Sequence, residues 1–108
     1  ISLAGLPDYG GANSVAINNG LLAVAYASAT NGAPGYVALF DAPTGALIKT
    51  IQVGPGPDHV TFTPDGSKLL TANEGERVAA TDAFDGSVSI ISLAGGPAAA
   101  TVTNTIGF

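Results

Sequence analysis

Short apolar runs alternate with turn-forming residues along the whole chain, and this pattern predicts β-strands. The runs are rich in β-branched, aromatic and small apolar side chains, and Gly or Pro interrupts the chain roughly every ten residues. Apolar residues rarely recur at helical spacing, so we expect little or no helix. The predicted strands lie near residues 14–18, 21–28, 35–41, 46–53, 58–63, 68–73, 87–93 and 100–104.

The residues between these runs have the composition of tight turns. Asn19-Gly20, Thr44-Gly45, Asp65-Gly66 and Asp85-Gly86 each supply a residue that tolerates positive φ, as hairpin turns require. Short strands joined by hairpin turns are typical of an antiparallel, all-β fold.

The strands also repeat. Ser14 and His59 open equivalent strands 45 residues apart (59 − 14), and Tyr36-Val37-Ala38-Leu39 corresponds to Ser87-Val88-Ser89-Ile90 after 51 residues (87 − 36). Between them, Leu22-Ala23-Val24-Ala25 is matched to Leu70-Thr71-Ala72-Asn73. A four-stranded unit repeating every ~40–50 residues is typical of β-propeller blades, and a solenoid fits less well because the turns are hairpin turns.

We therefore predict about two four-stranded antiparallel meander blades with flanking strands. Residues 1–12 would hold the end of a preceding blade, with Ile1-Ser2-Leu3 as its last strand, and an inter-blade turn. Residues 13–57 would form the first blade, and residues 58–108 the second blade and the start of the next connection. Matching positions in the two units should be among the most buried: Val15, Ile17, Val24, Val37, Leu39, Val60, Phe62, Leu70, Val88 and Ile90.

Composition narrows the function classes. The chain has 108 residues, of which 46% are hydrophobic and 10% charged, and its net charge is −5. Nucleic-acid binding needs clustered Lys and Arg, and the chain has three such residues. The longest apolar run, Leu21–Ala27, is too short for a transmembrane helix, and the absence of Cys excludes disulfides and thiolate chemistry.

Several stretches resemble a known family. Residues 53–76 read VGPGPDHVTFTPDGSKLLTANEGE, which resembles the blade motif of YVTN-type propellers. Residues 86–93 (GSVSIISL), 11–17 (GANSVAI) and 101–103 (TVT) extend the similarity to the choice-of-anchor I family, related to mesenchyme-specific cell-surface glycoprotein. His59 departs from the pattern, in which an apolar residue such as Met is expected.

The resemblance implies a secreted or surface-anchored bacterial β-propeller. Family members are several times longer than this chain, and the chain starts at Ile1 without Met, so we expect a processed product or an excerpt of a longer protein. The implied location is extracellular or at the cell surface, with the periplasm as an alternative. Some members carry phosphatase- or phytase-like labels, which no motif in this sequence supports.

One group of carboxylates is a candidate metal site. In a meander blade, the loop between strands two and three and the inter-blade turn emerge on the same face, where Ca²⁺ could find the six to eight oxygen ligands that it prefers. The alternative is that these acids solvate a long loop and cap its turns. The candidate ligands are Asp58, Glu74, Glu76, Asp82 and Asp85.

Other candidate residues have structural readings. His59 could act as a base or metal ligand, but without a nearby nucleophile it is better read as a hydrogen-bonded wall residue. Asn73 should bond neighbouring backbone, and Tyr9, Tyr26 and Tyr36 are too scattered along the sequence to predict a stacking platform. Residues 74–86 should form the most mobile or partner-dependent loop, with Phe84 tucked into the blade.

Two function classes remain open at this point. The first is a non-catalytic extracellular or cell-surface propeller segment that acts as a scaffold or binding module; the second is part of a metal-dependent, phosphatase- or phytase-like hydrolase. In either case the open faces of two blades should not face water. We expect them to be covered by the remaining blades of a parent chain or by other protein chains in an assembly.

Overall fold

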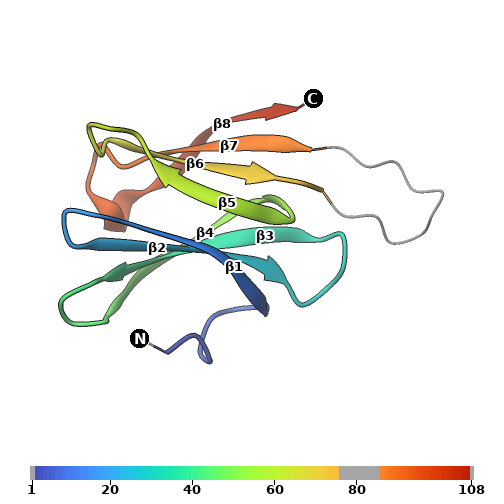
Figure 1. Ribbon diagram of the computed structural model, residues 1–108, viewed down its shortest axis with the longest axis horizontal. Coiled ribbons are helices and arrows are strands. Elements are labelled where there is room, and N and C mark those ends of the chain that lie inside the picture. The colour runs from blue at the N-terminus through green and yellow to red at the C-terminus, as the bar shows by residue number, and fades with distance from the viewer. Residues whose placement is uncertain (1, 76–85, 108) are drawn as a thin grey trace.

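The computed structural model describes residues 2–75 and 86–107, which form two four-stranded antiparallel sheets (Figure 1). All eight predicted strands are present, and the only helix in the described residues is one 3₁₀ turn, so the all-β prediction is confirmed. No helix among these residues is long and apolar enough to span a membrane. The elements are β1 Tyr9–Asn18, β2 Leu21–Ser28, β3 Pro34–Asp41, β4 Leu47–Pro55, β5 Pro57–Phe62, β6 Lys68–Asn73, β7 Ser87–Ser92, η1 Pro97–Ala99 and β8 Thr101–Gly107.

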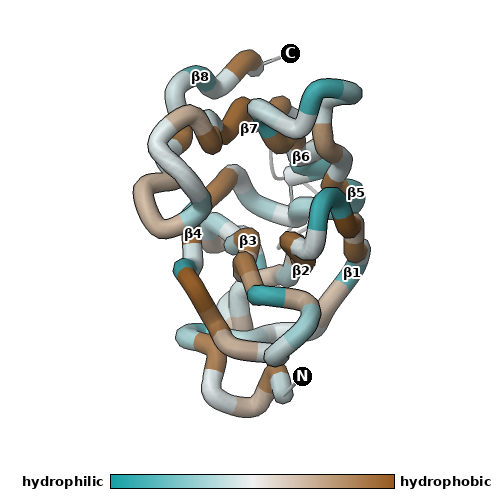
Figure 2. Tube along the Cα trace, turned by 90° about the vertical axis from the view of Figure 1, so that its left-hand side faces the viewer, coloured by the Kyte–Doolittle hydropathy of each residue, from teal (hydrophilic) through white to brown (hydrophobic). Residues whose placement is uncertain are grey.

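Both sheets are simple meanders. Sheet 1 has the order β1-β2-β3-β4 and sheet 2 the order β5-β6-β7-β8, so each strand pairs with its neighbour in sequence. The sheets stack face to face, and a single residue, Gly56, joins β4 to β5 at the crossing between them (Figures 1 and 2). Gly56 has φ +63°, a conformation that costs glycine little, so the crossing can be this short.

The main core lies between the two sheets. Alternate residues of β2 and β3, including Ala23, Val37 and Leu39, face β5, β6 and β7, which supply Val60, Leu69 and Ile91. All of these side chains are almost completely removed from water. Because strand side chains alternate between faces, the same strands point their other residues to the two outer faces of the stack.

The strand pairing aligns the two units. Each first strand contains an irregularity at the same place, so that Asn13 and Asp58 are both extra residues, which confirms the 45-residue offset. Val15 pairs with Val24 and Val60 with Thr71, so the second strands are offset by 47 residues. The predicted match of Leu22 with Leu70 was therefore wrong by one residue.

The offset grows from 45 to 47 residues because the second unit has a longer turn between its first and second strands. Asn19-Gly20 alone joins β1 to β2, whereas residues 63–67 join β5 to β6. A shift of one position moves every side chain of a strand to the other face. Leu69 therefore faces the core, and Leu70, which we expected to be buried, lies on the outer face of sheet 2 and is half-exposed.

The remaining burial errors follow one rule. Val24, Val37, Leu39 and Val60 are buried as predicted, but Val15 and Ile17 are 64% and 65% exposed. Phe62 is only partly buried, at the edge of the core. Val88 and Ile90 are also only partly buried, on the outer face of sheet 2. Apart from Phe62, every residue that was wrongly predicted to be buried lies on an outer face of the stack, which no described sheet covers.

The N-terminal residues differ from the prediction. Residues 2–8 form turns and no strand, and β1 begins at Tyr9, five residues before the predicted start at 14. Leu6 packs on Val24, Tyr26, Ala38 and Phe40 and so covers part of the outer face of sheet 1. The division of the chain at residues 12/13 and 57/58 stays a prediction.

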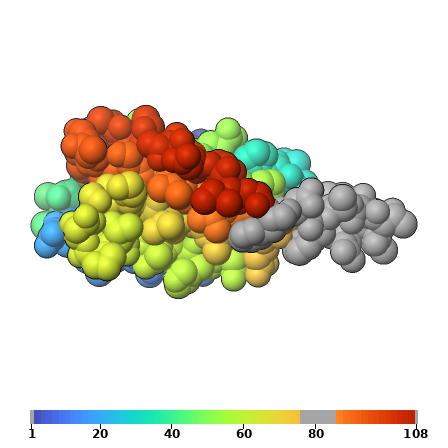
Figure 3. Space-filling view, turned by 90° about the horizontal axis from the view of Figure 1, so that it is seen from above, coloured from blue at the N-terminus to red at the C-terminus, as the bar shows by residue number. Residues whose placement is uncertain are grey.

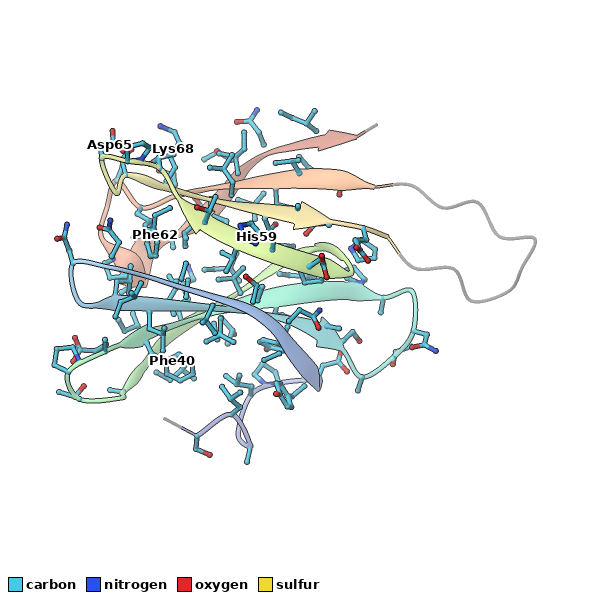
Figure 4. The ribbon with its side chains drawn as sticks, in the orientation of Figure 1. Phe40, His59, Phe62, Asp65 and Lys68 are labelled. Carbon is cyan, nitrogen blue, oxygen red and sulfur yellow. The ribbon has the colours of Figure 1, made fainter. Side chains whose placement is uncertain are left out.

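The turn between β5 and β6 is organised by Asp65 (Figure 4). Its Oδ1 accepts hydrogen bonds from the Ser67 amide (3.0 Å), the Ser67 hydroxyl (2.8 Å) and the Thr63 hydroxyl (2.8 Å). These donors, with a smaller contribution from the Lys68 charge, lower the pKa of Asp65 to about 2. Asp65 therefore has the structural role in a turn that the sequence predicts.

This turn predicts a specific acid sensitivity. Because the folded-state pKa of Asp65 lies below its ordinary value of 3.8, its ionised form stabilises the folded state above about pH 4. That stabilisation should be lost as the pH falls from about 4 to about 2. Urea titrations across this range should show a smaller loss of stability in Asp65→Asn than in the unmodified chain. An equal loss in both proteins would contradict this role of Asp65.

Candidate functional site

The predicted site face is the edge of the molecule from which the longer connections emerge, on the right in Figure 1. We call it the loop-bearing edge; in the described residues it comprises residues 29–33, Gly56, Asp58, Glu74 and Gly75. The chain after β6 is tied to the crossing, because the Glu74 amide donates to Gly56 O (2.8 Å) and the Gly75 amide to Pro55 O (2.9 Å). These two hydrogen bonds hold the backbone of Glu74 and Gly75 against the crossing.

Asp58 and Glu74 both lie at this edge with exposed side chains. Asp58 is the extra residue in the first strand of sheet 2, and such irregularities change the direction of a side chain relative to its neighbours. The structure thus places two of the five predicted ligands at one edge. Within residues 2–75 and 86–107, no three His, Asp or Glu side chains are grouped closely enough to hold a metal ion.

The other three predicted ligands, Glu76, Asp82 and Asp85, lie outside the described residues, as do Phe84 and most of the predicted loop 74–86. The Ca²⁺ site therefore stays a prediction. Asp41 and Asp65 lie at the opposite edge, where their carboxylates accept hydrogen bonds within turns.

His59 lies on β5 and points away from sheet 1 (Figure 4). It pairs with Ala72, next to Val60, whose side chain enters the core. His59 is exposed, and no hydrogen bond of its side chain to another described residue is found. The prediction of a hydrogen-bonded wall residue is thus not met in this structure, because the face on which His59 lies is an outer one.

A polar cluster is buried where β6 and β7 approach the crossing. Asn73 accepts a hydrogen bond from the Thr71 hydroxyl (3.0 Å) and donates to the hydroxyls of Ser87 (3.1 Å) and Ser89 (3.0 Å). We expected Asn73 to bond backbone, and that was wrong because three hydroxyl side chains surround it. A Cβ atom at Gly54 would lie 2.7 Å from Ser87 Oγ and 2.8 Å from Asn73 Nδ2, so this position leaves no room for a side chain.

The three tyrosines form one cluster, which corrects the expectation that they are scattered. Tyr26 stacks on Tyr36 with ring centroids 5.1 Å apart, and Tyr9 packs against Tyr26 at 5.4 Å with tilted rings. Tyr26 and Tyr36 are direct cross-strand partners in β2 and β3, at equal distances from the connection between them. Recognising that hairpin register in the sequence would have predicted the pair.

The cluster fastens the N-terminal segment. The buried Tyr26 hydroxyl donates to Pro7 O (2.9 Å), and the Ala29 amide donates to Asp8 O (2.9 Å). Burial, followed by the neighbouring Tyr36 and Asp8, raises the pKa of Tyr26 to about 12. Since Tyr26 is fully buried, this arrangement serves to attach residues 2–8 to sheet 1 and offers no open aromatic surface at Tyr26.

A shallow groove of about 230 Å³ lies at the opposite, hairpin-turn edge. Leu21, Phe62 and Leu93 provide apolar walls, and Asn18 and Asn19 provide polar groups. None of the predicted site residues lines it. It is the gap between the two sheets at their ends, beside the turn at Gly66.

Comparison with known proteins identifies a family. A family model described as the choice-of-anchor I domain matches residues 2–108. No curated protein matches the chain.

Proposed function

The chain belongs to the choice-of-anchor I domain family, and from this premise we propose that it is a non-catalytic scaffold or binding module outside the cell. In this proposal, its two sheets are successive blades of a β-propeller, covered on both outer faces by further sheets. The loop-bearing edge presents residues to another macromolecule. The family name refers to anchoring, which favours an extracellular or cell-surface location.

One observation carries the proposal: equivalent residues of the two sheets differ in exposure. Val15 and Val60 occupy the same position of their strands, yet Val15 is 64% exposed and Val60 only 2%. Sheet 1 covers Val60, whereas no described sheet lies over Val15. An apolar side chain at the same place in each unit is expected when every unit packs against a preceding one.

A repeated pentapeptide supports the same proposal. Residues 1–5 and 91–95 both read ISLAG. The Ala4 amide donates to Ser2 Oγ (3.3 Å), as the Ala94 amide does to Ser92 Oγ (3.3 Å). Leu3 O and Leu93 O each accept an amide hydrogen bond three residues later. Residues 2–5 and 92–95 thus form the same turn, as expected of repeating units.

The first strand of each sheet favours a scaffold over an enzyme, because in a propeller the first strand of a blade lines the central channel. Besides His59, the first-strand segments Ser14–Ile17 and Val60–Phe62 present Ser, Thr and apolar side chains, which are not general acids or bases. Phosphoester hydrolysis by this acidic chain would need a bound cation at the loop-bearing edge. That alternative depends on Asp58 and Glu74, together with the other three predicted ligands.

A hydrolysis assay separates the two function classes. The purified chain should release no p-nitrophenol from p-nitrophenyl phosphate above the buffer rate, with either millimolar Ca²⁺ or a chelator present. Turnover that requires Ca²⁺ and disappears in Asp58→Asn and Glu74→Gln would overturn the proposal. Asp41→Asn, at the opposite edge, is the matched control and should leave any such turnover unchanged.

A further inference from the structure

Two polar side chains of β1 hold the first strand of sheet 2. Asn13 Nδ2 donates a hydrogen bond to Pro57 O (3.1 Å), and Ser14 Oγ accepts one from the Val60 amide (3.2 Å). Both contacts are made to main-chain groups of β5, which lies beside β1 without pairing with it. These two hydrogen bonds therefore fix the position of β5 relative to β1.

The outer face of sheet 2 (Figure 3) carries the equivalents of these two residues. With the 45-residue offset of the first strands, Asp58 stands where Asn13 stands and His59 stands where Ser14 stands. Side chains alternate along a strand and Val60 enters the core, so His59 points away from sheet 1. It is placed to contact a further sheet as Ser14 contacts sheet 2.

The chemistry of His59 suits the same contact. A neutral imidazole ring has one nitrogen that accepts a hydrogen bond, as the Ser14 hydroxyl oxygen does in sheet 1. His59 is exposed, and its side chain makes no hydrogen bond to another residue in the described part of the chain. Lys68, also on this face, lies near Asp65 at the hairpin-turn edge and away from His59 (Figure 4).

Asp58 cannot repeat the contact that Asn13 makes. An ionised carboxylate accepts hydrogen bonds but has no donor to offer a carbonyl oxygen such as Pro57 O. Of the two contacts between the first strands of sheets 1 and 2, only the one made by Ser14 therefore has an equivalent on sheet 2, at His59.

We propose that His59 accepts a hydrogen bond from a main-chain amide in the first strand of a further sheet of the same fold, at the position equivalent to Val60. The inference rests on the proposed function, because it needs a further sheet over the outer face of sheet 2. The bound group is a first-strand amide because Ser14, the equivalent residue, holds the first strand of the sheet that follows it.

The existing contact can be tested in the chain itself. Ser14→Ala removes the acceptor of the Val60 amide, so the hydrogen-exchange rate of this amide should rise about tenfold. An unchanged rate would overturn the inference, because Ser14 would then not hold β5.

A chain lengthened by one sheet tests His59. Residues 54–56 followed by residues 12–55 are added after residue 108, which places the added sheet in the same register as sheet 2, because Ile106 corresponds to Ile51. This design repeats the one-residue crossing at Gly56. The amide of the added Val15 then stands where the Val60 amide stands and should be bound by His59.

His59→Ala should raise the exchange rate of that added amide about tenfold and leave the melting temperature of the original chain unchanged. Thr61→Ala is the matched control, because Thr61 lies two residues along the same face and corresponds to Ala16, which has no hydroxyl. The control should change neither measurement.

The lengthened chain also separates this inference from the proposed function. A lengthened chain that melts above the original, but whose added Val15 amide exchanges at the same rate with and without the His59 ring, would overturn the role of His59 and retain the propeller. A lengthened chain that melts no higher than the original would overturn both.

Discussion

Val60→Asp is expected to unfold the protein, while the same substitution at the equivalent Val15 leaves the free chain folded. Val60 is 2% exposed and lies in the core between the sheets, so an ionised carboxylate there would lose its hydration without gaining a partner. Such a change costs more than about 4 kcal/mol, a large part of the stability of a domain of this size. Val15 is in water already, and the same change there should cost less than about 0.5 kcal/mol.

Far-UV circular dichroism and urea unfolding of the two variants measure this difference directly. Because both substitutions introduce the same residue at the same position of a first strand, they differ mainly in what lies over the strand. Comparable destabilisation by both variants would mean that Val15 is covered in the free chain.

The strands and turns were predictable because local residues determine them. Asn19-Gly20 closes a two-residue hairpin, and the apolar run Leu21–Ala27 forms most of the strand that follows it. The third strands also align as expected, because Tyr26 pairs with Tyr36 and Asn73 with Ser87. Short-range turn chemistry and alternation along the chain were sufficient for these features.

Burial was harder to predict because it depends on neighbours that the sequence pattern does not place. Val15 and Ile17 have the same apolar character as the buried Val60, and only the packing of sheet 1 on sheet 2 separates them. The choice between Leu69 and Leu70 depended on the length of one turn, which adjacent apolar residues could not reveal. Predicting the tyrosine cluster and the Asn73 cluster would have required knowing which residues pair across neighbouring strands.

For the candidate site, the sequence predicted which edge carries Asp58 and Glu74 but not how they are held there. The crossing at Gly56 brings the two together, since the backbone of Glu74 bonds its carbonyl while Asp58 follows two residues later. That arrangement needs the specific hydrogen bonds of the crossing. Composition shows only that the chain as a whole is acidic.

The second large effect is expected at Asn73, whose side chain is 2% exposed. Asn73→Ala removes the acceptor for the Thr71 hydroxyl and the donor to Ser87 and Ser89, and it leaves a cavity beside Gly54. Buried hydroxyls without partners and the cavity together should lower the free energy of unfolding by about 2–4 kcal/mol.

The matched control is Asn104→Ala, which truncates an exposed asparagine of β8 and should change stability by less than about 0.5 kcal/mol. Hydrogen exchange adds a local readout, because the Glu74 and Gly75 amides, which bond the crossing directly after Asn73, should lose protection in Asn73→Ala alone. If Asn73→Ala matched the control in both measurements, the polar cluster would not be what holds β6 to the crossing. The loop-bearing edge would then depend on the backbone bonds of Gly56 and Pro55 without support from the side chains beneath them.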